Sequence, residues 1–202
     1  MDWVEGVPVS ELPSFKLTDA VASYLADQFA TMMRALKQAG IAHGDLEFSN
    51  ILISGFDLKL VDYDSMFVAE LLKLGSPELG NPGFQHPKRR ATDYAPYLDN
   101  FSAWLIHFLL RNLSLNPNLF ELAALCLQEE RQGTAEHVTL RSLESHPDSL
   151  VRKMGSLLRH LTERPLHLIP DLHPDESLAT LISRDSRDLH KPGGLFKRKP
   201  KP

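Results

Sequence analysis

The feature that most constrains the fold is a run of regularly spaced apolar residues early in the chain. Between residues 17 and 38 apolar side chains recur every three or four positions, the spacing of one buried face of an α-helix. Gly40 follows and predicts the end of this helix, because glycine adopts the left-handed backbone that closes many helices. The other elements must therefore cover this face.

The elements that follow are predicted from shorter patterns. Two β-rich runs, 51–53 and 58–61, flank a turn containing Gly55 and Asp57 and predict a small hairpin. Residues 75–96, rich in Gly, Pro and Asn, predict a long irregular surface segment of the kind that is often functional. Further helices are predicted over residues 97–113, 119–132 and 148–161, the last with Asp148 at its start. The predicted fold class is mainly α with a small β-hairpin.

Composition describes an ordinary globular chain. Its 202 residues suffice for one domain with a short appendage, and 22 Lys and Arg against 26 Asp and Glu give a net charge of −4. This balance does not indicate binding to membranes or to nucleic acid in general. Local exceptions are the basic turn 88–90, interpreted as solvated, and the tail from Lys191, which is rich in Lys, Arg, Pro and Gly and is predicted to be disordered.

The cellular compartment is predicted from what the sequence lacks. Cys126 is the sole cysteine and lies in an apolar run, so burial is expected rather than a disulfide or a nucleophile. The start shows no signal-peptide pattern, and no apolar stretch approaches the roughly 20 residues that cross a bilayer. We expect a reducing cytoplasm.

The candidate chemistry lies between residues 43 and 64. The first part reads His43-Gly-Asp-Leu-Glu-Phe-Ser-Asn50, and Asp62 follows the second strand of the hairpin. The loop after a long helix and the end of a strand can bring three oxygen ligands suited to Mg2+ together. The alternative is that these are ordinary loop residues, since Asp and Asn favour loops for local hydrogen bonding.

This pattern resembles the protein-kinase superfamily, whose catalytic loop reads H-R-D-x-x-x-x-N and whose metal-binding motif is D-F-G. The resemblance implies that Asp45 accepts or orients the proton of the attacking hydroxyl. It also implies that Asn50 binds one Mg2+ and that Asp62 bridges the Mg2+ ions to the phosphates of ATP. Here the implied cofactors are ATP and Mg2+.

The resemblance extends to both flanks of the motif. Leu52 would pack under the adenine, and Trp3 and Val4 lie in a hinge-like segment whose backbone would contact it. Asp99 stands where the family places a buried Asp that braces the catalytic loop. Together with G-N-P-G-F-Q-H-P at 80–87, the motifs resemble a bacterial branch of kinase-like proteins.

The implied organisation has three parts. Residues 1–15 form a hinge-like, extended connector, 16–164 a kinase-like C-terminal lobe with the N-terminal lobe absent, and 165–202 an extended or disordered basic tail.

Several positions depart from the family pattern. Gly44 replaces the Arg that often pairs with a phosphorylated activation segment, so switching by such a phosphate loses its cationic partner. Glu47 stands where protein Ser/Thr kinases usually carry a Lys, and a carboxylate there repels phosphate unless it is turned away or bound to metal. Because H-G-D also resembles aminoglycoside and choline phosphotransferases, the acceptor is either a protein or a small-molecule hydroxyl.

The function implied by the resemblance is that of an ATP- and Mg2+-dependent phosphotransferase lobe. The sequence contains no glycine-rich phosphate loop and no V-A-I-K-like lysine, so we expect the chain alone to be inactive. An N-lobe would come from a longer natural chain or from a partner protein in trans. The alternative is a noncatalytic, pseudokinase-like interaction module in which the acidic loop residues are leftovers.

Overall fold

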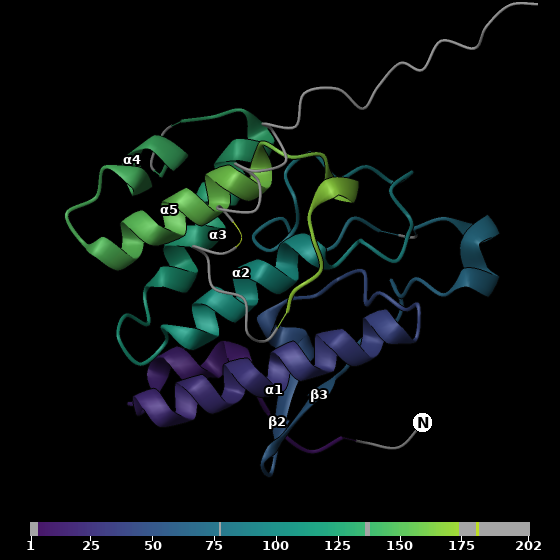
Figure 1. Cartoon of the computed structure of the whole chain (residues 1–202), viewed down its shortest axis with the longest axis horizontal. Coiled ribbons are helices and arrows are strands. Elements are labelled where there is room, and N and C mark those ends of the chain that lie inside the picture. The colour runs from purple at the N-terminus through teal and green to yellow at the C-terminus, as the bar shows by residue number, and fades with distance from the viewer. Residues whose placement is uncertain (1–3, 77, 136–137, 174–180, 182–202) are drawn as a thin grey trace, which may run out of the picture.

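The computed structural model describes residues 4–76, 78–135, 138–173 and 181. Within these residues the chain is mainly helical, with one small antiparallel sheet (Figure 1). The α-helices are α1 (Asp19–Gln38), α2 (Asn100–Arg111), α3 (Leu119–Gln132), α4 (Leu140–Glu144) and α5 (Ser149–Thr162). The strands are β1 (Val7–Pro8), β2 (Ile51–Ser54) and β3 (Asp57–Leu60), and short 3-10 helices are η1 (Val9–Ser14), η2 (Phe48–Asn50), η3 (Ala69–Leu74) and η4 (Leu166–Leu168).

Helix α1 confirms the predicted amphipathic helix. The Thr18 side chain caps its start by accepting a hydrogen bond of 3.3 Å from the Val21 amide. Its buried residues follow the expected spacing: Ala22, Leu25, Ala26, Phe29, Ala30 and Met33. Gly40, with φ of 69°, lies just beyond the end in the left-handed conformation that the sequence predicted. One face of α1 thus packs on α2, and α1 also contacts β3.

The predicted hairpin is present, and a third strand extends it. Strands β2 and β3 pair in antiparallel register, with Ile51 opposite Leu60. On the other edge of β2, Val7 of β1 lies opposite Ile53. The sheet order is β1-β2-β3.

The expectation of an extended connector over 1–15 is corrected for its described part. Residues 7–14 form β1 and η1, and Val9 and Leu12 are buried in the core. The prolines there suggested an irregular chain, but Pro8 lies in an edge strand, where a missing N–H costs no ladder hydrogen bond. Residues 1–3, which include Trp3, lie outside the described residues.

The helical half is organised around α2, most of whose residues are buried. It contacts α1 on one side and α5 on the other, and α3 also packs on α5 (Figure 1). The helices predicted over 97–113, 119–132 and 148–161 are confirmed as α2, α3 and α5. Asp148 caps α5 by accepting a 2.7 Å hydrogen bond from the Leu150 amide. In the described chain, no helix combines the length and the apolar content needed to cross a bilayer.

The tail boundary is corrected as well, because residues 165–173 pack against the helical part of the structure. In Figure 1 this yellow-green segment runs from the end of α5 along α2 to α1. Asn100 donates a 2.7 Å hydrogen bond to the Ile169 carbonyl, and the Trp104 indole donates one of 3.0 Å to the Pro170 carbonyl. The segment has no helical period, yet Ile169 is buried and the segment's carbonyls satisfy polar groups of α2. The remaining tail, 174–180 and 182–202, lies outside the described residues.

A first prediction concerns the close contact between α4 and α5. A Cβ at Gly155 would lie 2.8 Å from the Glu144 nitrogen and 2.9 Å from Leu143 Cβ. We expect Gly155→Ala to destabilise the fold by about 1–3 kcal/mol, because overpacking outweighs the roughly 1 kcal/mol that alanine gains in a helix. Urea unfolding measures the change. Ser156→Ala, at an exposed position of the same helix, should change stability by less than about 0.5 kcal/mol.

A second prediction concerns acid stability. Burial lowers the pKa of His107 to about 4, helped by the charge of Arg111 and opposed by that of Asp27. Unfolded histidine has a pKa near 6.5, so the stability tied to neutral His107 is present above pH 6.5 and is lost as pH falls toward 4. This loss is on the order of 3 kcal/mol. In denaturant melts from pH 7 to 4, His107→Gln should lose less stability than wild type, whereas His173→Gln, at an exposed position, should follow wild type.

Candidate functional site

The candidate site is built on a loop whose backbone is held by one buried carboxylate. Asp99, only 3% exposed, accepts hydrogen bonds from the His43 amide at 2.5 Å and the Gly44 amide at 2.9 Å. Burial raises the pKa of Asp99, while the two amide donors favour its charged form. Asp99 thus occupies the bracing position that the resemblance predicts.

His43 connects this loop to the strand that precedes Asp62. Its Nε2 donates a 2.8 Å hydrogen bond to the Val61 carbonyl. The Val61 amide donates in turn to the Asn50 carbonyl at 3.0 Å. Val61 is therefore held on both sides, and the next residue, Asp62, emerges beside the loop. His43 therefore has a structural role in this arrangement.

Asp45 and Asn50 are brought into direct contact. The Asn50 side-chain amide donates to the Asp45 backbone carbonyl at 2.9 Å and lies 3.4 Å from Asp45 Oδ2. Asn50 is buried at the end of η2, whereas Asp45 is half-buried. The five-residue spacing read from the sequence thus corresponds to one hydrogen-bonded turn.

Asp62 directly follows Val61, whose amide is hydrogen-bonded to the Asn50 carbonyl. Its side chain is exposed, and no hydrogen bond joins it to Asp45 or Asn50 in the described structure. Its φ of 63° makes it the one non-glycine with positive φ among the described residues. Such conformations are uncommon and cluster at functional sites.

Whether the three side chains share one ion stays a prediction. The charges of Asp45 and Asp62 both raise the pKa of Glu47, so the two carboxylates act on the same neighbour. Within the described ranges, no group of three or more His, Cys, Asp or Glu is placed to hold a metal ion. The proposed set, with two carboxylates and one amide, would need oxygens from a nucleotide to complete the coordination of Mg2+.

Asn81 is a site residue to which the sequence analysis gave no role. Its backbone amide donates a 2.7 Å hydrogen bond to Asp45 Oδ1, and its side-chain amide donates to Glu47 Oε2. Burial and the charge of Asp45 raise the pKa of Glu47, and the hydrogen bond from Asn81 opposes them. Glu47 is thus turned toward Asn81. In the sequence, the motif 80–87 indicates where this segment lies but does not reveal the role of its asparagine.

An aromatic cluster packs against the two segments that form the site, 43–50 and 80–89. Phe48 of η2 lies 5.2 Å from Phe84 and 5.3 Å from Phe120 of α3, measured between ring centroids. Phe84 and Phe120 are 5.6 Å apart. These separations fall within the favourable range for aromatic pairs. The loop 43–50 and the segment 80–89 are therefore held together by one apolar cluster.

The predicted adenine side is described only in part. Leu52 and Val4 are half-buried, and Trp3 lies outside the described residues. The hinge-like segment does run against β2, because a Cβ at Gly6 would come within 3.1 Å of Leu52 Cβ. The adenine contacts themselves stay a prediction.

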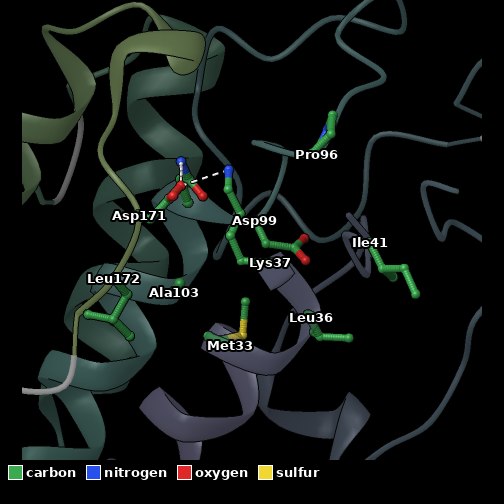
Figure 2. A pocket seen from close by; sticks show the side chains of 10 residues that line it. Met33, Leu36, Lys37, Ile41, Pro96, Asp99, Ala103, Asp171 and Leu172 are labelled. Carbon is green, nitrogen blue, oxygen red and sulfur yellow. Dashed lines mark hydrogen bonds and ion pairs between the residues drawn. The ribbon is translucent and has the colours of Figure 1, made fainter. Parts of the chain in front are cut away.

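A separate pocket lies between the end of α1, the start of α2 and residues 171–172. Figure 2 shows Lys37 reaching from α1 to Asp171, where its ammonium lies 2.8 Å from the carboxylate. Asn100 donates to the same carboxylate at 3.1 Å. Of the residues discussed above, Asp99 also lines this pocket, but its carboxylate is bound to the His43 and Gly44 amides. Because Lys37, Asp171 and Asn100 pair with one another, we assign the pocket to packing.

In comparisons with known proteins, no family model and no curated protein matches the chain. The resemblance to protein kinases therefore depends on the motifs and contacts described above.

A third prediction tests the close packing of the loop. Gly44 has φ of 82°, and a Cβ there would lie 2.1 Å from the Ser65 carbonyl oxygen. We expect Gly44→Ala to destabilise the fold by about 3 kcal/mol or more, since backbone strain and overlap add. Gly40→Ala is the matched control, because Gly40 has φ of 69° with nothing within 4 Å and should lose only about 1 kcal/mol. Equal losses in urea unfolding would contradict the packing argument.

Proposed function

We propose that this chain is the C-terminal lobe of a protein-kinase-like, ATP-dependent phosphotransferase. Asp45 acts as the catalytic base that orients the acceptor hydroxyl, and Asn50 and Asp62 bind the Mg2+ of ATP. The observation that carries the proposal is the linked set of contacts around Asp45 and Asn50, with Val61 hydrogen-bonded to Asn50 immediately before Asp62. Composition or spacing alone would not support it.

The hydrogen bonds of Asp45 suit the proposed role. Its Oδ1 accepts a 2.7 Å hydrogen bond from the Asn81 backbone amide. Among the described residues, its Oδ2 has only the long 3.4 Å contact with the Asn50 side chain. One oxygen therefore fixes the carboxylate, and the other retains the capacity to accept the proton of a substrate hydroxyl. In phosphoryl transfer such positioning matters more than covalent chemistry by the protein.

The acceptor side carries a carboxylate where many protein kinases carry a lysine. Glu47 is held beside Asp45 by Asn81, so neutralising the transferred phosphate depends on Mg2+ and on cations from elsewhere. The covering loop and the lysine are not in this sequence, and we propose that an N-lobe of a longer protein or a partner supplies them. The acceptor is a protein or small-molecule hydroxyl.

The second candidate function is a noncatalytic kinase-like interaction module. It is favoured by Asn81, which donates hydrogen bonds to the carboxylates of both Asp45 and Glu47. Polar groups whose hydrogen bonds are made within the protein can be retained without a ligand. The two candidates differ in whether a nucleotide and a divalent ion meet at Asn50 and Asp62.

A fourth prediction separates them by using Mn2+ with ADP as a paramagnetic probe for nuclear magnetic resonance. We expect Mn-ADP to broaden the backbone signals of Asn50 and Asp62 first. Asp62→Asn should weaken this binding by about tenfold or more, because it removes a charged metal ligand. Asp57→Asn removes an exposed carboxylate from the hairpin and should leave binding unchanged. Broadening that spares Asn50, or that survives in Asp62→Asn, would favour the interaction module.

A further inference from the structure

Arg89 is buried, in contrast to the solvated basic turn expected over 88–90. It is only 4% exposed, whereas Lys88 and Arg90 on either side are exposed. Its Nη1 donates to the Gly44 carbonyl at 2.5 Å and to Gln85 Oε1 at 2.6 Å, and its Nη2 donates to Ser76 Oγ at 3.3 Å. A buried guanidinium is costly unless it is paired, so these contacts call for an explanation.

The contact with Gly44 means that both backbone polar groups of this residue are hydrogen-bonded to side chains. We call this pair of contacts the clamp. The Gly44 N–H donates to Asp99, and the Gly44 carbonyl accepts from Arg89. The next residue is Asp45, so the backbone that leads into its carboxylate is fixed from two opposite elements. The clamp joins the start of α2 to the segment 80–89 through the loop.

Gly44 itself cannot carry the arginine of H-R-D. A Cβ there would lie 2.1 Å from the Ser65 carbonyl oxygen, so the space beside the loop is closed to any side chain at this position. The guanidinium that reaches the loop comes instead from Arg89, a residue 45 positions later in the chain.

The contacts of Arg89 also form a closed ring with Asp45. Arg89 donates to the Gln85 side chain. The backbone amide of Gln85 donates to the Asn81 backbone carbonyl at 3.1 Å, and the backbone amide of Asn81 donates to Asp45 Oδ1 at 2.7 Å. The other arm runs from Arg89 to the Gly44 carbonyl and along the chain to Asp45. Loss of the guanidinium breaks both arms.

The charge on Arg89 is compensated within the same site. Burial lowers the pKa of Arg89, and the charges of Asp99 and Asp45 oppose that effect. Guanidinium stays protonated at any physiological pH, and the acceptors of Arg89 described above are a backbone carbonyl and two uncharged side chains. These contacts therefore do not depend on the titration of any partner.

We infer that Arg89 is a positioning residue for Asp45: it holds the loop and the segment 80–89 together without a phosphorylated residue. The inference rests on the proposed function only in calling Asp45 the catalytic base. It concerns the regulation of that site, because contacts with unmodified groups would let the loop and the segment 80–89 assemble without phosphorylation.

The test follows the Asn81 backbone amide, which reports the hydrogen bond to Asp45, in the 202-residue chain without nucleotide. We expect Arg89→Gln to shift this amide signal upfield and to speed its hydrogen exchange at least about tenfold more than that of the α5 amides. Arg90→Gln removes an equal charge from an exposed neighbour and should change neither quantity. A general loss of stability would instead speed exchange in α5 and at Asn81 by the same factor.

Two further arms keep the test decisive. Arg89→Lys retains a cation but cannot donate in the guanidinium's fork geometry, so an intermediate Asn81 signal is expected. Phosphatase treatment of wild type should leave the signal unchanged. The inference is overturned if folded Arg89→Gln shows the wild-type Asn81 amide signal. If Arg89→Gln does not fold, the same result in Arg89→Lys overturns it. A shift of the wild-type Asn81 signal upon phosphatase treatment overturns it as well. These results are independent of Mn-ADP binding, so failure here and failure of the proposed function are told apart.

Discussion

The buried carboxylate of Asp99 is the contact on which the candidate site depends. It accepts from two consecutive backbone amides, those of His43 and Gly44, while standing at the start of α2. A carboxylate at a helix N-terminus benefits from the positive end of the helix dipole, and the charge of Arg89 adds to this compensation. The loop thus takes its shape from a rigid helix.

Segments that are distant in the sequence contact one another around Asp99. The loop 43–50 follows α1, the segment 80–89 follows a long irregular stretch, and Asp99 begins α2. Asn81 and Arg89 connect the second segment to the first by hydrogen bonds, and the rings of Phe48 and Phe84 connect them by packing. Polar and apolar contacts therefore favour the same placement of Asp45, the consistency expected of a site that is held in advance of its ligand.

The sequence predicted those features that depend on local pattern. Helix α1 with Gly40 at its end, the hairpin and helix α3 each carry their signal within a few neighbouring residues. Features set by distant partners could not be read this way. Strand β1 exists because Ile53 lies opposite Val7. Arg89 is buried, unlike Lys88 and Arg90, because distant partners such as the Gly44 carbonyl accept its hydrogen bonds. The role of Asn81 depends on a carboxylate 36 positions earlier.

The segment 165–173 has a consequence for work with pieces of this chain. Its carbonyl groups are the acceptors for the Asn100 amide and the Trp104 indole on the largely buried helix α2. A protein trimmed to the last residue of α5 would leave both donors unsatisfied at a newly uncovered apolar surface, which invites aggregation. Domain boundaries drawn for expression should therefore fall beyond His173, even though regular helix ends well before it.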